Sequence, residues 1–137
     1  MMFSRFRRPV LLVAALGGSI VLAGCSVSSS SSPAEGTVTV DFDVDEGQDP
    51  ADCDANGAVS LDLDVTDSHG VVRTFTVPCD RFTITVALAP GFYTADATLV
   101  DGSDNARTST APIDTFQIIS NTDVNVALVD FQQSSFL

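Results

Sequence analysis

The sequence has no lysine and no tryptophan, and it contains only one histidine and one tyrosine. Eighteen acidic residues, sixteen of them aspartates, stand against six arginines, which gives a formal net charge of −12. This charge repels nucleic-acid phosphates and disfavours docking of the protein surface onto anionic lipid head groups. The lack of tryptophan also removes the aromatic platforms that sugar-binding sandwiches usually present. Because of its charge, we exclude nucleic acid as a partner.

Groups that could carry catalysis are equally scarce. The single histidine, His69, lies in a predicted turn beside Gly70, and no nucleophile–base arrangement is visible around it. Aspartates that alternate along an exposed strand lack the burial that separates the pKa values of a glycosidase pair. The sequence predicts a non-enzymatic protein that needs no cofactor, and a hydrolase with paired aspartates is the alternative.

Residues 1–24 have the layout of a secretory signal. A positive n-region comes first, and the stretch 9–23 that follows is apolar except for Ser19. This stretch is short for a membrane-spanning helix. The alternatives are an uncleaved N-terminal helix and a plain signal peptide. The basic residues of the n-region are Arg5, Arg7 and Arg8.

The tetrapeptide Leu22-Ala23-Gly24-Cys25 closes the apolar stretch and resembles the lipobox of bacterial lipoproteins. The resemblance implies that Cys25 is lipidated and that the peptide before it is removed. Two or three acyl chains hold a protein stably in a membrane, whereas one chain holds it only marginally. The lipobox resemblance therefore implies an extracytoplasmic protein of the cell envelope, with the membrane and an envelope protein as partners. In a diderm host, Ser26 after the cysteine is compatible with the outer membrane.

Removal of the signal makes the chain still more acidic. The remaining 113 residues keep eighteen acidic groups against Arg73, Arg81 and Arg107, a net charge near −15. Self-repulsion at this charge strains the compact state, and salt or divalent cations should relieve it. Residues 25–36 are rich in serine and have almost nothing to bury. They predict a flexible, disordered spacer.

Residues 37–137 alternate between apolar and polar side chains, the period of half-buried antiparallel strands. Turn residues at Asp67–Gly70, Pro90–Gly91 and 101–105 separate the segments. No stretch has a convincing helical period. The sequence therefore predicts one all-β domain, a small antiparallel β-sandwich of about seven strands. The expected strands cover 38–44, 59–65, 71–77, 82–88, 93–99, 107–110, 113–119 and 122–131.

Residues 86–95 contain Leu88, Pro90, Gly91 and Tyr93 in the order L-x-P-G-x-Y. This pattern resembles a hairpin of transthyretin-like and Cna-B-like sandwich modules, including carboxypeptidase regulatory-like domains. The resemblance implies a structural or binding module at a cell surface. Isopeptide cross-links of the Cna-B type are excluded because the chain has no lysine. The whole chain also resembles small lipoproteins with a cysteine pair in the first half of a sandwich.

Once lipid takes Cys25, the other two cysteines form an even pair in an oxidising compartment. Cys53 precedes one expected strand and Cys79 follows the next, so a hairpin between those strands brings both to the same end. We expect a disulfide between them. Two free thiols or a metal pair are the alternatives, although zinc needs more ligands than two cysteines and His69 supply.

The segment Asp52-Cys53-Asp54-Ala55-Asn56-Gly57 matches the opening of a calcium loop, D-x-D-x-N-G. The twelfth position is Leu63, where such a loop needs a bidentate glutamate. Asp52, Asp54 and Asn56 are thus candidate calcium ligands, and an acidic turn is the other interpretation. A calcium-dependent adhesion or sensing module is therefore the alternative function. The acidic stripes elsewhere, on expected strand faces, are typical of a solvated surface.

Overall fold

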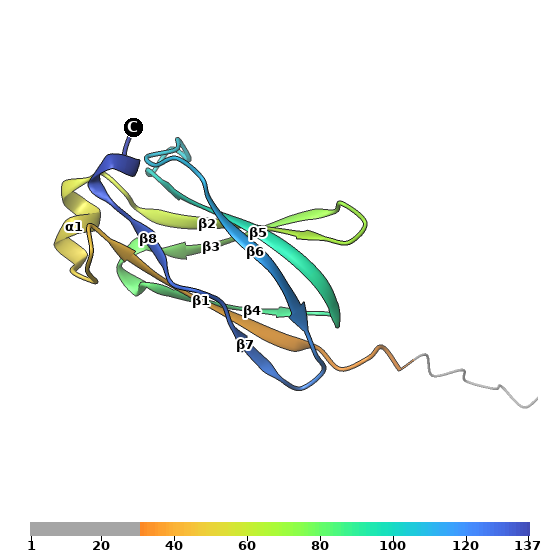
Figure 1. Ribbon diagram of the computed structural model, residues 1–137. Coiled ribbons are helices and arrows are strands. Elements are labelled where there is room, and N and C mark those ends of the chain that lie inside the picture. The colour runs from red at the N-terminus through yellow and green to blue at the C-terminus, as the bar shows by residue number, and fades with distance from the viewer. Residues whose placement is uncertain (1–30) are drawn as a thin grey trace, which may run out of the picture. The chain divides into compact units, whose positions relative to one another are not determined.

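The structure, a computed structural model, describes residues 31–137. The expected signal and Cys25 lie outside the described residues. The described part of the chain folds into two sheets, which confirms the all-β sandwich (Figure 1). The elements are β1 (Gly36–Val44), α1 (Pro50–Ala55), β2 (Ser60–Asp67), β3 (Val72–Pro78), η1 (Cys79–Arg81), β4 (Thr83–Leu88), β5 (Gly91–Val100), β6 (Ala111–Ile118), β7 (Asp123–Asn125), β8 (Val129–Phe131) and η2 (Gln133–Ser135).

Strands that follow one another in the chain often lie in different sheets. One sheet has the order β4-β1-β7, with β8 also beside β1, and the other has the order β3-β2-β5-β6. The chain crosses between the sheets after β1, β3, β4 and β6. Strand β1 thus lies in the middle of its sheet, with partners on both sides.

The pairing of β1 departs from the expected antiparallel sandwich. β1 is antiparallel to β4 but parallel to β7 and β8, so the antiparallel prediction is wrong at this edge. The closing strand expected at 122–131 is split, because residues 126–128 lie between two separate ladders. Val126 still donates its backbone N–H to the Thr39 carbonyl oxygen at 3.2 Å. Alternation along a strand encodes its buried face but not the direction of its partner.

The predicted hairpin over Asp67–Gly70 forms, but two other expectations differ from the structure. Residues 107–110 form no regular strand, and a short helix, α1, is present. Thr108 there is buried, and its hydroxyl accepts a hydrogen bond from the Leu99 backbone N–H at 3.1 Å. The Thr108 side chain thus takes the place of a backbone acceptor for the Leu99 N–H. The helix α1 was not predicted, because six residues are too few to show a helical period.

The Pro90–Gly91 turn connects the two sheets rather than two paired strands, since β4 and β5 lie in different sheets. The Tyr93 ring is buried, stacks on Phe116 at 6.0 Å and donates its hydroxyl to the Ala89 carbonyl oxygen at 2.7 Å. The motif that resembles a hairpin is therefore a crossing between sheets.

The inner faces form one hydrophobic core. Phe42 lies near its centre, with the rings of Phe82 and Phe131 at 5.7 and 6.4 Å. The outer faces are rich in threonine and aspartate, which pair across strands: Thr76 donates to Asp62 at 2.7 Å, and Thr74 donates to Asp64. Threonine hydroxyls thus satisfy carboxylates that have no lysine to pair with.

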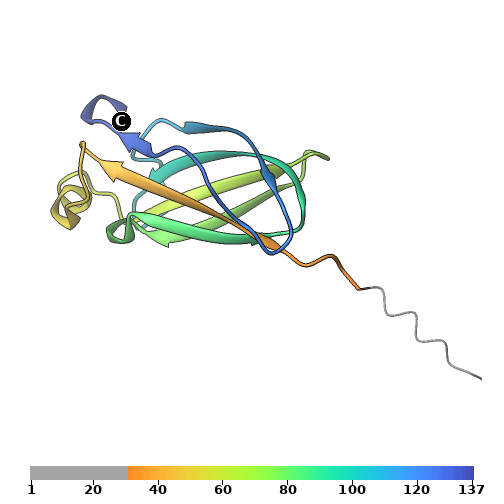
Figure 2. The same cartoon turned by 60° about the horizontal axis from the view of Figure 1, so that its bottom comes forward.

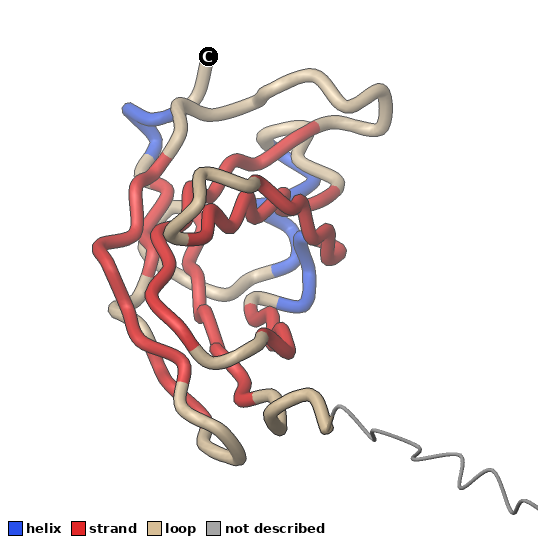
Figure 3. Tube along the Cα trace, turned by 90° about the vertical axis from the view of Figure 1, so that its right-hand side faces the viewer, coloured by secondary structure: helices blue, strands red, loops and turns tan. Residues whose placement is uncertain are grey.

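The sandwich has two distinct ends. We call the end where β1 begins the near end; it holds the turns 67–71, 89–90 and 119–122 (Figures 1 and 2). The opposite end, the far end, holds α1, η1, the loop 101–110 and the C-terminal segment 132–137. Figure 3 views the molecule from the near end, with the strands in red and the turns in tan.

Candidate functional site

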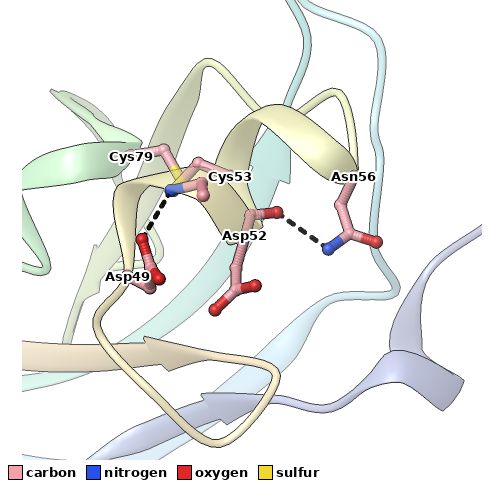
Figure 4. The surroundings of a disulfide bond; sticks show 6 residues. Asp49, Asp52, Cys53, Asn56 and Cys79 are labelled. Carbon is pink, nitrogen blue, oxygen red and sulfur yellow. Dashed lines mark hydrogen bonds between the residues drawn. A yellow bond between two sulfur atoms is a disulfide. The ribbon is translucent and has the colours of Figure 1, made fainter.

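The far end is organised around the short helix α1. Asp49 caps it, because its carboxylate accepts the Ala51 backbone N–H at 2.9 Å, and Pro50 fits the first turn (Figure 4). Asn56 ends it, since its backbone N–H and its side-chain amide both donate to the Asp52 carbonyl oxygen. Gly57 follows with a positive φ of 67°, a conformation that favours glycine.

The predicted cysteine pair is present. Cys53 of α1 is bonded to Cys79 of η1, with the Cα atoms 6.1 Å apart and both side chains buried (Figure 4). The hairpin β2–β3 brings these two positions to the same end, as expected. The disulfide therefore fastens the six-residue helix α1 to η1 and to the sandwich.

Arg107 provides a second fastening that the sequence did not reveal. Its Nε donates to the Asn56 carbonyl oxygen at 3.1 Å, and its guanidinium lies close against Gly57. Its backbone carbonyl accepts the Leu137 N–H at 3.0 Å, so this arginine joins α1, the loop 101–110 and the C-terminal segment.

The three candidate calcium ligands lie along α1 and at its end, not in an open loop. Asn56 is already engaged, because its side-chain oxygen accepts the Gln133 amide at 3.3 Å while its NH₂ caps the helix. Within residues 31–137, no three His, Cys, Asp or Glu side chains form a group that could hold a metal ion. Asp52 and Asp54 thus stand on a short helix that Asp49 already caps.

His69 lies at the exposed tip of the β2–β3 hairpin, with its Nδ1 4.0 Å from Asp67. Asp67 itself closes the turn, because its carboxylate accepts the backbone N–H groups of Val71 and His69 at 3.0 and 2.8 Å. These hydrogen bonds, that from Val71 foremost, lower the pKa of Asp67. The carboxylate therefore acts as a turn residue.

Asp101 plays the same part in the loop 101–110. The backbone N–H groups of Asn105 and Ser103, in that order of effect, lower its pKa. The side-chain amide of Asn105 contributes as well. Both perturbed carboxylates thus have structural causes, and every buried side-chain polar atom among the described residues is hydrogen-bonded.

A groove of about 440 Å³ opens between β6 and the split strand β7–β8. Val126 and Leu128 line one wall, Ile113 and Phe116 the other, and Asp130 lies at its rim. It exists because residues 126–128 leave the ladder beside β1. The alternation of apolar and polar residues in the sequence did not predict this groove.

No protein-family model matches this chain, and no curated protein matches it. Among residues 31–137, none of the helices has the length and apolar character required to cross a bilayer.

Proposed function

We propose that this protein is a membrane-anchored lipoprotein of the cell envelope whose body is a non-enzymatic structural or interaction module. The observation that carries the proposal is the tetrapeptide Leu22–Cys25 at the end of the apolar stretch. The pairing of Cys53 with Cys79 supports it, since it leaves Cys25 as the one cysteine without a partner in the chain's own disulfide. Disulfides of this kind persist in oxidising compartments outside the cytosol.

The body has surfaces suited to an envelope protein partner. The edge strand β6 resists strand addition, because it carries Pro112 and a bulge opposite Thr94. The groove between β6 and β7–β8 and the loops of the far end offer side chains to a partner, and β3 and β4 are the other edge strands of the two sheets. At β6, contact through side chains is therefore favoured over contact through added backbone hydrogen bonds.

We also propose that the body is related to transthyretin-like and Cna-B-like modules. Support comes from the buried Leu88 and from Tyr93, whose hydroxyl closes the Pro90–Gly91 turn. An experimental structure that superimposes on such modules with the same order of strands tests this relation. A different order of connections would contradict it.

The anchor is tested by membrane fractionation and intact-mass analysis of the full chain and of Cys25→Ser. We expect the parent to carry acyl chains on residue 25 and to sediment with membranes, and Cys25→Ser to be soluble or unprocessed. The double variant Cys53→Ser/Cys79→Ser is the matched control, since it removes two thiols but leaves the lipobox intact. A Cys25→Ser variant that partitions like the parent would refute the anchor.

A further inference from the structure

Exposed apolar side chains gather at the near end of the sandwich. Four of the seven large hydrophobic residues that are exposed within residues 31–137 lie there, in turns or at strand ends. Phe92 follows the β4–β5 turn, Ile119 follows β6, and Val71 and Val72 lie at the β2–β3 hairpin. The strand register brings them together, because Gly91 pairs with Ile118 and Thr66 pairs with both Val72 and Thr94.

The charges are distributed the opposite way. Within the described chain, the far-end segments 45–59, 79–82 and 101–110 carry eight carboxylates and two arginines. The turns 67–71, 89–90 and 119–122 of the near end carry one carboxylate, Asp67, together with His69. With Glu35 and Asp123 beside these turns, the near end holds three carboxylates against eight at the far end, so it is the less acidic of the two ends.

The chain from the proposed anchor enters the body at this apolar end. Gly36, the first residue of β1, is packed so tightly that a Cβ would lie 2.2 Å from the Ile119 carbonyl oxygen. Thr37 donates its backbone N–H to Thr122 at 2.9 Å, and Glu35 accepts from Asn121 at 3.0 Å. Residues 35–37, where the chain enters the body, are thus held against the β6–β7 turn.

We propose that the near end is a lipid-contacting rim, in which Phe92, Ile119, Val71 and Val72 rest on the bilayer surface. The proposal depends on the lipidation of Cys25 proposed above. The eleven residue-to-residue steps from Cys25 to Gly36 can span at most about 40 Å. Because β1 alone is about 30 Å long, the far end reaches the bilayer only if that segment runs back along the whole body.

Charge favours the same orientation. Repulsion between exposed charges decays over about 8–10 Å at physiological salt. The carboxylates of the far end lie beyond that distance when the near end faces the bilayer. Glu35, Asp67 and Asp123 remain close to the surface, and Asp67 and Asp123 accept hydrogen bonds from the body. They keep the contact shallow, at the level of the head groups.

The absence of tryptophan from the chain allows a direct test. Phe92→Trp places a single fluorophore at the rim, and Val59→Trp places one at the far end; the two native side chains are 57% and 55% exposed. The full lipidated chain carrying either substitution is reconstituted into phosphatidylcholine vesicles that contain lipids with a nitroxide quencher on the head group. Vesicle flotation confirms anchoring, and circular dichroism confirms that each variant is folded.

We expect the emission of Phe92→Trp to shift to shorter wavelength and to be quenched several-fold more strongly than that of Val59→Trp. Equal quenching of the two, or stronger quenching of Val59→Trp, in chains that float with the vesicles would overturn the lipid-contacting rim and leave the anchor standing. Failure of both chains to float, with residue 25 unmodified by mass, would instead refute the anchor itself.

Discussion

Asp64 of β2 lies directly across from Asp96 of β5, with both carboxylates on the outer face of the same sheet. Asp64 also accepts a hydrogen bond from Thr74 on its other side. Like charges directly opposite each other destabilise a strand pair. The Asp64–Asp96 pair is therefore one place where the carboxylates of this lysine-free chain repel each other.

Asp96→Thr should raise the free energy of unfolding by about 0.5 kcal/mol at low salt, because it removes this repulsion. The gain should shrink at 1 M NaCl, where charges are screened within about 3 Å. Urea titration followed by circular dichroism measures both values. Asp114→Thr, in the bulge of β6 and outside the strand register, is the control. An equal gain at both salt concentrations would contradict the electrostatic cause.

Removal of the disulfide by Cys53→Ser/Cys79→Ser should lower the free energy of unfolding by about 3.5 kcal/mol, the chain-entropy value for a loop of this size. The two cysteines are 26 residues apart. Urea titration of the folded body measures the loss, with Cys25→Ser as the control that leaves the bond intact. A change well below 1 kcal/mol would contradict the chain-entropy value for this loop.

Arg107→Met should destabilise the far end by about 1.5 kcal/mol, since it removes a charged donor from the Asn56 carbonyl oxygen. Hydrogen exchange should accelerate in α1 and in the C-terminal segment but not in β2. Arg81→Met is the matched control, because Arg81 is exposed in η1. If both variants behave alike, Arg107 does not hold these segments together.

The turn carboxylates Asp67 and Asp101 should titrate below the ordinary aspartate value of 3.8 in a carboxyl-carbon NMR titration. A pKa lowered by folding stabilises the protein above the unfolded value, and this contribution is lost as the pH falls through the folded value. The Val71 and Asn105 amide signals should therefore shift with a midpoint below pH 3.8. Titration at or above that value would contradict the role of the turns.

Calcium should raise the melting temperature no more than magnesium does at the same concentration, because Asn56 is engaged by Gln133 and by the end of α1. Asp52→Ala/Asp54→Ala should leave the calcium effect unchanged. Thermal melts of both proteins in each ion measure this. A calcium-specific increase that the double variant abolishes would favour the calcium-dependent module instead.

The sequence predicted the features that depend on local alternation and missed those that depend on distant partners. Val38, Val40 and Phe42 alternate with polar residues, and their burial follows from that pattern. The parallel direction of β7 and β8 depends on how the chain returns from β6, which no local pattern encodes. The role of Arg107 was missed for the same reason, since its acceptor, Asn56, is 51 residues away in sequence.

The central place of β1 has a mechanical consequence. A tether that pulls at Gly36 draws on a strand bonded to β4 on one side and to β7 and β8 on the other. Force along this strand shears both ladders at once, whereas force on an edge strand would peel one ladder bond by bond. If Cys25 carries the proposed lipid, a body held in this way should withstand tension applied along the chain between the membrane and a bound partner.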